Sequence, residues 1–285
     1  MASAFDQYGY IATLANSIPE LKTILNRALA GKWTPDKFSQ AVQDSRWWKA
    51  NSDQVKQNAI LKATKPGEYN AQRNALIAKI RTLAKGMGVG LTEGAHGTLA
   101  ALVNHAMALG WDDTTLQQNI GHYYTYRGGT SPGQAGALQQ QIRNIRADYG
   151  LGNNSQMDAH HVHMILMGQE TVDSFKAQAE QSALSRYPGF AQQLREGQTM
   201  TQIADPYIQT IAQTLEMAPS DVDLYDPSVQ KALQAKDQHG NNVPMTLWQV
   251  ADMMRQDPRY DHTKQAVNDA YSMVNQIGKD WGFSA

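Results

Sequence analysis

The chain contains no cysteine among its 285 residues. Disulfide bonds, thiolate metal ligands and a Cys–His peptidase site are therefore excluded. The absence of cysteine is also typical of proteins made in a reducing cytoplasm. The sequence has no run of about 18 consecutive apolar residues, which is the length that an ordinary transmembrane helix needs. We therefore expect no integral membrane segment.

Charge is also scarce, because charged residues make up 18% of the chain and the net charge is −1. Binding to nucleic acid through counterion release needs clustered Lys and Arg. The nearest approach to such a cluster is Lys79, Arg81 and Lys85, which has the pattern of a solvated helix face. We expect no specific nucleic-acid partner. The chain instead has 29 glutamines, which suit surfaces that meet other proteins or simply replace Glu and Lys on exposed helices.

Apolar residues recur with the period of an α-helix along most of the chain. Strand-like alternation is nearly absent. The sequence therefore predicts an all-α fold. The clearest stripes are Leu21, Ile24, Leu25, Ala28 and Leu29; Leu76, Ile77, Ile80, Leu83 and Met87; Ile208, Ile211, Ala212 and Leu215; and Val267, Ala270, Tyr271, Val274 and Ile277.

A short turn pattern joins several of these predicted helices. Residues 30–34, 109–112 and 167–171 each hold a glycine that can end one helix and a polar residue that can begin the next. A weaker copy begins at Gly197. Because the copies are unevenly spaced, they predict an irregular bundle of repeated helical hairpins rather than a regular solenoid. Thr34–Pro35, Asp205–Pro206 and Asp226–Pro227 each predict a helix start in which a cap is followed by proline. Ser17 lies three residues before Glu20 and predicts a helix start with a capping box.

Two segments interrupt the helical pattern. Residues 128–136 are rich in Gly, Ser and Pro, and we interpret them as a linker between an N-terminal helical domain (1–127) and a C-terminal one (137–285). The same segment could instead be an exposed loop within one domain. Residues 236–245 carry turn-forming residues and predict a short β-hairpin or an exposed loop.

Histidines cluster at His160, His161 and His163, beside Asp158. Imidazoles at i and i+3 of a helix, here His160 and His163, can share one zinc ion. No established zinc motif accompanies them, and histidines on a helix are commonly partly buried polar residues or a pH-sensitive patch. They are weak candidates for metal ligands, and we expect no metal or other cofactor.

Candidate acid–base residues are isolated along the sequence. Glycoside hydrolysis needs two carboxylates that face one cleft, yet residues such as Glu93 and Glu170 lie apart on predicted helix surfaces. Residues 86–90 superficially resemble a phosphate-binding loop but lack the preceding strand and the Gly-Lys-Ser/Thr ending. We interpret them as the end of a helix. The sequence thus favours a protein that is not an enzyme.

Aromatic residues are better candidates for binding. Trp47 and Trp48 follow Trp33 and point about 100° apart on a helix, so both cannot face one core. Trp and Arg are frequent in interface hot spots. The alternative is that these side chains close domain cores. The interface candidates are Trp33, Trp47, Trp48, Tyr123, Tyr124, Tyr126, Trp248 and Trp281.

Several segments together resemble a helical module in virion proteins of phages that infect actinobacteria. The resemblance covers roughly Pro19 to Phe283. The residues that carry it are Trp33-Thr34 with Phe38, Ser45–Ser52, Phe175, Tyr187-Pro188, Ile203–Tyr207, Ala212–Glu216, Asp223-Leu224, Asp226-Pro227, Ala232–Gln234, Leu247-Trp248, Asp257–Tyr260 and Gly278–Phe283.

The resemblance implies a tail-associated, internal or portal-proximal virion protein, made in the host cytoplasm. Its partners would be other virion proteins and further copies of itself. Such modules sometimes accompany a cell-wall-degrading domain, but the catalytic residues of that domain have no counterpart here. A separate alternative is a peptidoglycan hydrolase used in host entry, with a carboxylate such as Glu93 or Glu170 as general acid. A metal-responsive binding module that uses His160, His161 and His163 is a third hypothesis.

Overall fold

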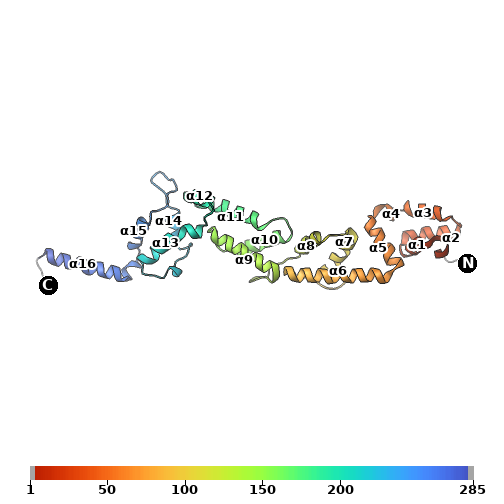
Figure 1. The fold of residues 1–285 in the computed structure, drawn as a ribbon, viewed down its shortest axis with the longest axis horizontal. Coiled ribbons are helices and arrows are strands. Elements are labelled where there is room, and N and C mark those ends of the chain that lie inside the picture. The colour runs from red at the N-terminus through yellow and green to blue at the C-terminus, as the bar shows by residue number, and fades with distance from the viewer. Residues whose placement is uncertain (1–3, 282–285) are drawn as a thin grey trace. The chain divides into compact units, whose positions relative to one another are not determined.

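The computed structural model describes residues 4–281, which form sixteen α-helices and three short 3-10 helices without a β-strand (Figure 1). The all-α prediction is confirmed. No helix in this part of the chain is long and apolar enough to cross a membrane. The chain divides into unit 1, Met1–Leu138 with Val162–Gln169, and unit 2, Gln139–His161 with Glu170–Ala285. Residues 128–136 fall within unit 1 in this division, and their role as a flexible linker stays a prediction.

Unit 1 holds the first eight helices and parts of α9 (Gly133–Asp148) and α10 (Ser155–Leu166). Its N-terminal core is built from the buried faces of α1, α2 and α3, with Leu14, Leu21 and Phe38 almost fully buried. The eight helices are α1 (Ala4–Ser17), α2 (Pro19–Ala30), α3 (Pro35–Gln43), α4 (Arg46–Ala50), α5 (Asp53–Thr64), α6 (Pro66–Met87), α7 (Thr98–Leu109) and α8 (Asp113–Gly121).

Unit 2 holds the remaining helices and one larger core. Tyr187, Ile211 and Val250 are completely buried in it, so it joins α13, α15 and the end of α11. Its helices are α11 (Val172–Arg186), α12 (Ala191–Arg195), α13 (Met200–Thr214), α14 (Pro227–Leu233), α15 (Leu247–Arg255) and α16 (Lys264–Asp280), with 3-10 helices at Pro188–Phe190, Pro219–Asp221 and Tyr260–His262.

The predicted turns between helices are confirmed. Gly110 ends α7 with a positive φ of 63°, and the Asp112 side chain caps α8 by accepting from the amide of Thr115. Only glycine adopts that backbone conformation without strain. Thr34, Thr171 and Thr199 cap α3, α11 and α13 in the same way. The local pattern of glycine followed by a polar cap is therefore enough to define these helix boundaries.

Two predicted helix starts are wrong. Ser17 is the last residue of α1, and α2 begins at Pro19 with no side-chain cap. Pro206 lies inside α13, which begins at Met200 under a capping box formed by Thr199 and Gln202. Proline inside a helix removes one backbone hydrogen bond. The capping box and the burial of the α13 apolar face offset that loss, so the helix continues through it.

Residues 86–90 are the end of a helix, and residues 236–245 are a loop. Gly88 ends α6 in a left-handed conformation, which confirms the helix-end interpretation of residues 86–90. The carbonyl oxygen of Pro132 lies 2.0 Å from where a Cβ of Gly88 would be, so no larger residue fits there. Residues 236–245 form an exposed loop with one isolated antiparallel bridge between Lys236 and Asn242. This loop projects from unit 2 between α14 and α15 (Figure 1).

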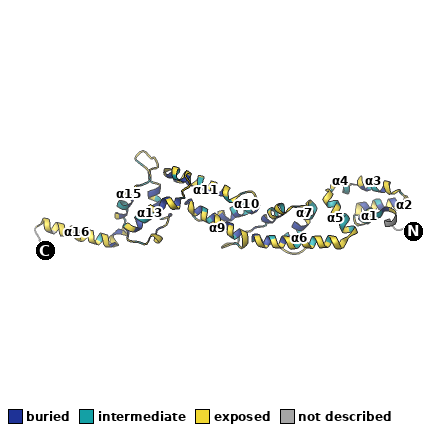
Figure 2. Cartoon of the chain, viewed as in Figure 1, coloured by how far each residue is buried: buried dark blue, intermediate teal, exposed yellow. Residues whose placement is uncertain are grey.

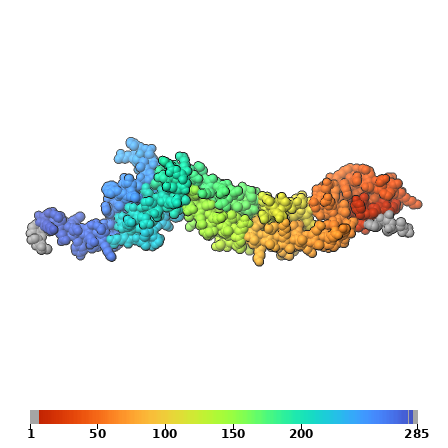
Figure 3. All heavy atoms as spheres, in the orientation of Figure 1, coloured from red at the N-terminus to blue at the C-terminus, as the bar shows by residue number. Residues whose placement is uncertain are grey.

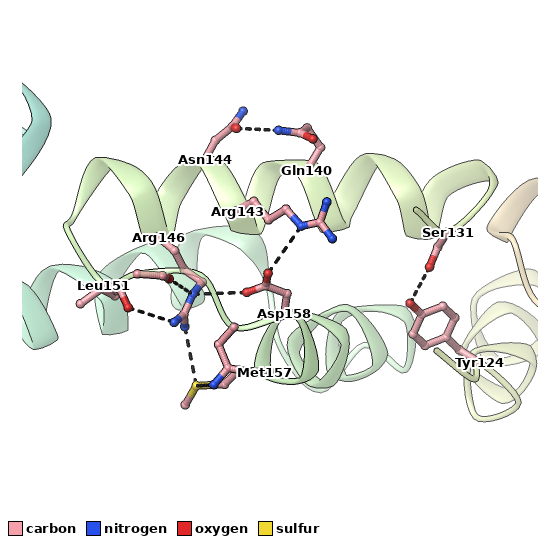
Figure 4. Close-up of polar contacts among 11 residues, drawn as sticks. Tyr124, Ser131, Gln140, Arg143, Asn144, Arg146, Leu151, Met157 and Asp158 are labelled. Atoms are coloured by element: carbon pink, nitrogen blue, oxygen red, sulfur yellow. Dashed lines mark hydrogen bonds and ion pairs between the residues drawn. The ribbon is translucent and has the colours of Figure 1, made fainter. Parts of the chain in front are cut away.

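A buried ion-pair cluster links α9 and α10 inside unit 2. The Asp158 carboxylate, 1% exposed, lies 3.3 Å from Arg146 Nε and 3.6 Å from Arg143 Nε (Figure 4). Arg146 also donates to the carbonyl oxygens of Leu151 and Gly152. Burial raises the pKa of Asp158, and the charges of Arg146 and Arg143 offset part of that rise. The two arginines compensate a charge that would otherwise be unstable in the interior.

Candidate interaction surface

The apolar stripe predicted for residues 267–277 lies on α16 and is exposed. Tyr271 and Val274 are 68% and 65% exposed, and Trp281, the C-cap residue that follows the helix, is 76% exposed. Figure 2 shows exposed residues along the length of this helix. The stripe is a candidate interaction surface because large contiguous apolar patches on proteins commonly mark binding sites.

The base of α16 is held by three contacts within unit 2. The side chain of Thr263 accepts from the amide of Ala266 at 3.0 Å. The two carboxylate oxygens of Glu216 accept from the amides of Lys264 and Gln265, each at 2.9 Å. A carboxylate at a helix N-terminus also interacts favourably with the helix dipole. The first turn of α16 is therefore fixed by a residue 48 positions away in the sequence.

A tyrosine closes the same junction. The hydroxyl of Tyr260 donates to Asp269 Oδ2 at 2.9 Å, and Ala266 packs against the unit 2 core. Desolvation, followed by the hydrogen bond to Asp269, raises the pKa of Tyr260. The C-terminal helix α16 extends away from the rest of unit 2 (Figure 3). The first turns of α16 are therefore attached to unit 2, and its apolar face is exposed to a possible partner.

A second exposed apolar group lies at the N-terminal end of α15. Trp248 is 71% exposed, beside Leu247, which is also exposed. Thr246 and Gln249 form a capping box that fixes this helix start. Val243, in the projecting loop, is exposed as well. Trp248 and Trp281, two of the predicted interface residues, are therefore both available to a partner.

The tryptophans predicted in unit 1 have a different environment. Trp33, Trp47 and Trp48 are half-buried and pack against the N-terminal core. The Trp33 carbonyl oxygen accepts from the Tyr8 hydroxyl at 3.0 Å, and the ring of Trp48 lies 5.2 Å from the ammonium of Lys56. These rings help to close the core and keep part of their surface exposed.

A capping contact that the sequence did not predict holds the backbone at Trp47. The carboxylate of Glu20 accepts from the amides of Arg46 and Trp47 at 2.9 and 3.0 Å. Ser45 caps the same helix by accepting from Trp48. This arrangement repeats that of Glu216 and Thr263 at α16. Neither carboxylate cap could be read locally, because 26 and 48 residues separate the partners.

Two of the three predicted tyrosines, Tyr123 and Tyr124, line a hollow in unit 1. Tyr124 is buried, and its hydroxyl lies 2.8 Å from Ser131 Oγ (Figure 4). Tyr123 and Tyr126 are half-buried. A cavity of about 290 Å³ is lined by Tyr123, Tyr124, Arg127 and the glycines at 88 and 90, among others. The interface role of these tyrosines stays a prediction.

The histidine cluster is dispersed in the structure. His160 is exposed, whereas Nδ1 of His161 lies 2.8 Å from Glu170 Oε2 and its ring packs on Phe175. The ring of His163 lies 6.2 Å from that of Tyr124. Across residues 4–281, no three or more His, Asp or Glu side chains are grouped so that they could hold a metal ion.

The two carboxylates of the hydrolase alternative have structural partners. Both oxygens of Glu93 accept from the guanidinium of Arg81, at 3.0 and 2.7 Å. This contact holds the pKa of Glu93 below its ordinary value. A general acid needs the opposite shift. Glu170 accepts from Gln178 Nε2 at 3.1 Å in addition to its contact with His161.

No protein-family model, curated protein or solved structure matches this chain.

Proposed function

We propose that this chain is a non-enzymatic structural protein of a bacteriophage virion and acts by assembling with other virion proteins. It would occupy a tail-associated, internal or portal-proximal position after synthesis in the host cytoplasm. The observation that carries the proposal is the exposed apolar face of α16 on its anchored base. Burial of such a face against a protein partner is favourable at about 25 cal/mol per Å².

Two further observations support an assembly role. The exposed Trp248 and Leu247 offer a second apolar contact on the same unit, so one unit could join two partners. The resemblance to virion modules spans both units and points to the same class of protein. The low charge of the chain fits protein partners better than nucleic acid.

The experiment is to purify phage particles that encode this chain and to ask whether it is part of them. We expect peptides of the chain in mass spectra of density-purified particles, in a fixed ratio to the major structural proteins. A tag on the chain should appear at one defined position in electron micrographs. Particles that lack the chain throughout purification would contradict the proposal.

The same material tests the hydrolase alternative. Folded chain placed in a gel with actinobacterial cell wall should produce no clearing. If clearing appears and is lost on Glu170→Gln, the chain is an enzyme and the proposal is wrong. Glu93→Gln is the matched variant, because Glu93 is paired with Arg81 and has a lowered pKa.

A further inference from the structure

The exposed apolar residues of α16 follow the spacing of a coiled coil. Val267, Val274 and Trp281 are seven residues apart, and Ala270 and Ile277 lie between them at the complementary positions. This alternation of three and four residues places Val267, Ala270, Val274 and Ile277 on one seam of α16. Trp281 continues the spacing at the C-cap, directly after the last helical residue, Asp280. We call these five residues the α16 seam; Tyr271 and Met273 flank it and are also exposed.

We propose that the α16 seam pairs with the α16 seam of a second copy of this chain, so that two copies join through their C-terminal helices. The inference rests on the proposed function, because it names the first partner in the assembly. Each helix has the same face to offer, so a two-fold axis between two copies would bury both seams at once.

The area available is sufficient for a stable contact. The exposed parts of the seam and its two flanking side chains amount to roughly 700 Å² per copy, close to the ~800 Å² per partner of a standard interface. Two aromatic side chains, Tyr271 and Trp281, provide much of that area and are more than two-thirds exposed. Aromatic anchors of this kind dominate the energy of protein interfaces.

The charges of α16 favour a copy of itself over a lipid surface. Its four charged residues, Lys264, Asp269, Lys279 and Asp280, lie outside the seam and sum to zero. Identical helices bring identical residues together, so a seam without charge pairs without repulsion. Helices that lie on membranes instead carry a polar face rich in Lys and Arg, which α16 lacks.

Because the base of α16 is attached to unit 2, pairing of this helix would also join the units that carry it. Glu216, Thr263 and Tyr260 fix the first turns of α16 to the core of unit 2. A contact between two α16 seams would therefore join two units and not merely two free tails.

The test is sedimentation velocity of the full chain over a range of concentrations. We expect the wild-type chain to be a dimer and the double variant Val274→Asp/Ile277→Asp to be a monomer. The matched control is Asn268→Asp/Asn275→Asp, which adds the same charge to the same helix but outside the seam, and which should stay dimeric. A wild-type monomer at every concentration up to its solubility limit would overturn the inference, as would a dimer that persists in the seam variant.

A second variant tests the seam even if the double Asp variant fails to fold, because it should strengthen the dimer. Ala270→Leu places leucine at a seam position where two-stranded coiled coils favour it. The dissociation constant of the dimer should fall at least ten-fold. If it rises or does not change, the seam is not the contact.

Particle association distinguishes this inference from the proposed function. A chain that is monomeric in solution yet present in particles overturns self-pairing and leaves the structural role intact. A seam-dependent dimer that is absent from particles supports self-pairing and contradicts the virion role.

Discussion

Two helices of unit 2, α13 and α16, have similar apolar stripes in the sequence but different environments in the structure. On α13, Ile203, Ala204, Ile211 and Ala212 are buried, with Ile211 and Ala212 at 0% exposure. On α16, the corresponding face is open to solvent (Figure 2). Amphipathic periodicity therefore identifies a face that needs a partner, but it does not identify whether that partner is the same chain or another one.

Burial should determine the cost of a substitution in unit 2 even where the side chain is charged, and a buried carboxylate on α10 tests this. Asp158→Asn should destabilise unit 2 by about 3–5 kcal/mol, because it leaves Arg146 and Arg143 without a compensating charge. Native-state hydrogen exchange of residues 139–148 and 155–161, the parts of α9 and α10 that belong to unit 2, measures this separately from unit 1. If the free energy of unfolding changes by no more than it does for substitution of an exposed residue, the ion pair contributes little to the stability of unit 2.

Removing apolar atoms from each stripe tests the comparison directly. Ile211→Ala should cost about 2–5 kcal/mol, the usual range for emptying a buried site. Val274→Ala, measured at concentrations where the chain is monomeric, should change the free energy of unfolding by no more than about 0.5 kcal/mol. Urea denaturation of both variants gives the difference. Equal effects would show that α16 packs against its own chain in solution.

Each unit has one helix whose start is capped by a distant carboxylate, Glu216 at α16 in unit 2 and Glu20 at α4 in unit 1. Removing each carboxylate should have a similar effect. Glu216→Ala should cost about 1 kcal/mol, the usual effect of losing a helix cap, and should raise the exchange of the first amides of α16 without affecting α13. Glu20→Ala should do the same to α4 in unit 1. Glu216→Gln, which retains an acceptor oxygen, should lie between Glu216→Ala and the wild type. Protection that is unchanged in Glu216→Ala would mean that Thr263 and Tyr260 hold the helix without Glu216.

The smallest expected effect is on the pH dependence of the α16 base. The pKa of Tyr260 is raised above its ordinary value of 10.0, so the folded state holds the phenol proton more tightly than the unfolded state. The resulting stabilisation is present below that ordinary value and is lost as pH rises through the folded pKa. The protection factors of the α16 amides, which are corrected for the base-catalysed exchange of an unstructured chain, should therefore fall above about pH 10 relative to neutral pH.

The matched variant for this measurement is Tyr260→Phe, which retains the ring and removes the titrating hydroxyl. Its α16 amides should respond less to alkaline pH than those of the wild type. An equal response in the two proteins would place the pH dependence elsewhere, for instance at Tyr207, whose pKa burial also raises.

Most of the fold could be predicted because its signals are local. Helix periodicity, glycine at helix ends and the caps Thr34, Asp112 and Asp226 act over one or two turns of chain. The prediction failed at Pro206, where burial of one helix face outweighs a proline signal. It also failed at Glu20, whose carboxylate caps a helix that begins 26 residues later.

The same distinction between local and long-range signals applies to the candidate interaction surface. Helical periodicity is enough to predict an apolar stripe on α16, and Trp248 and Trp281 are candidates for contact from their residue type. In the folded unit, the α13 stripe is enclosed by α14 and α15, whereas the α16 stripe is exposed. Periodicity depends only on neighbouring turns of the chain, but burial depends on contacts between residues far apart in it, so the sequence pattern does not predict which stripe is covered.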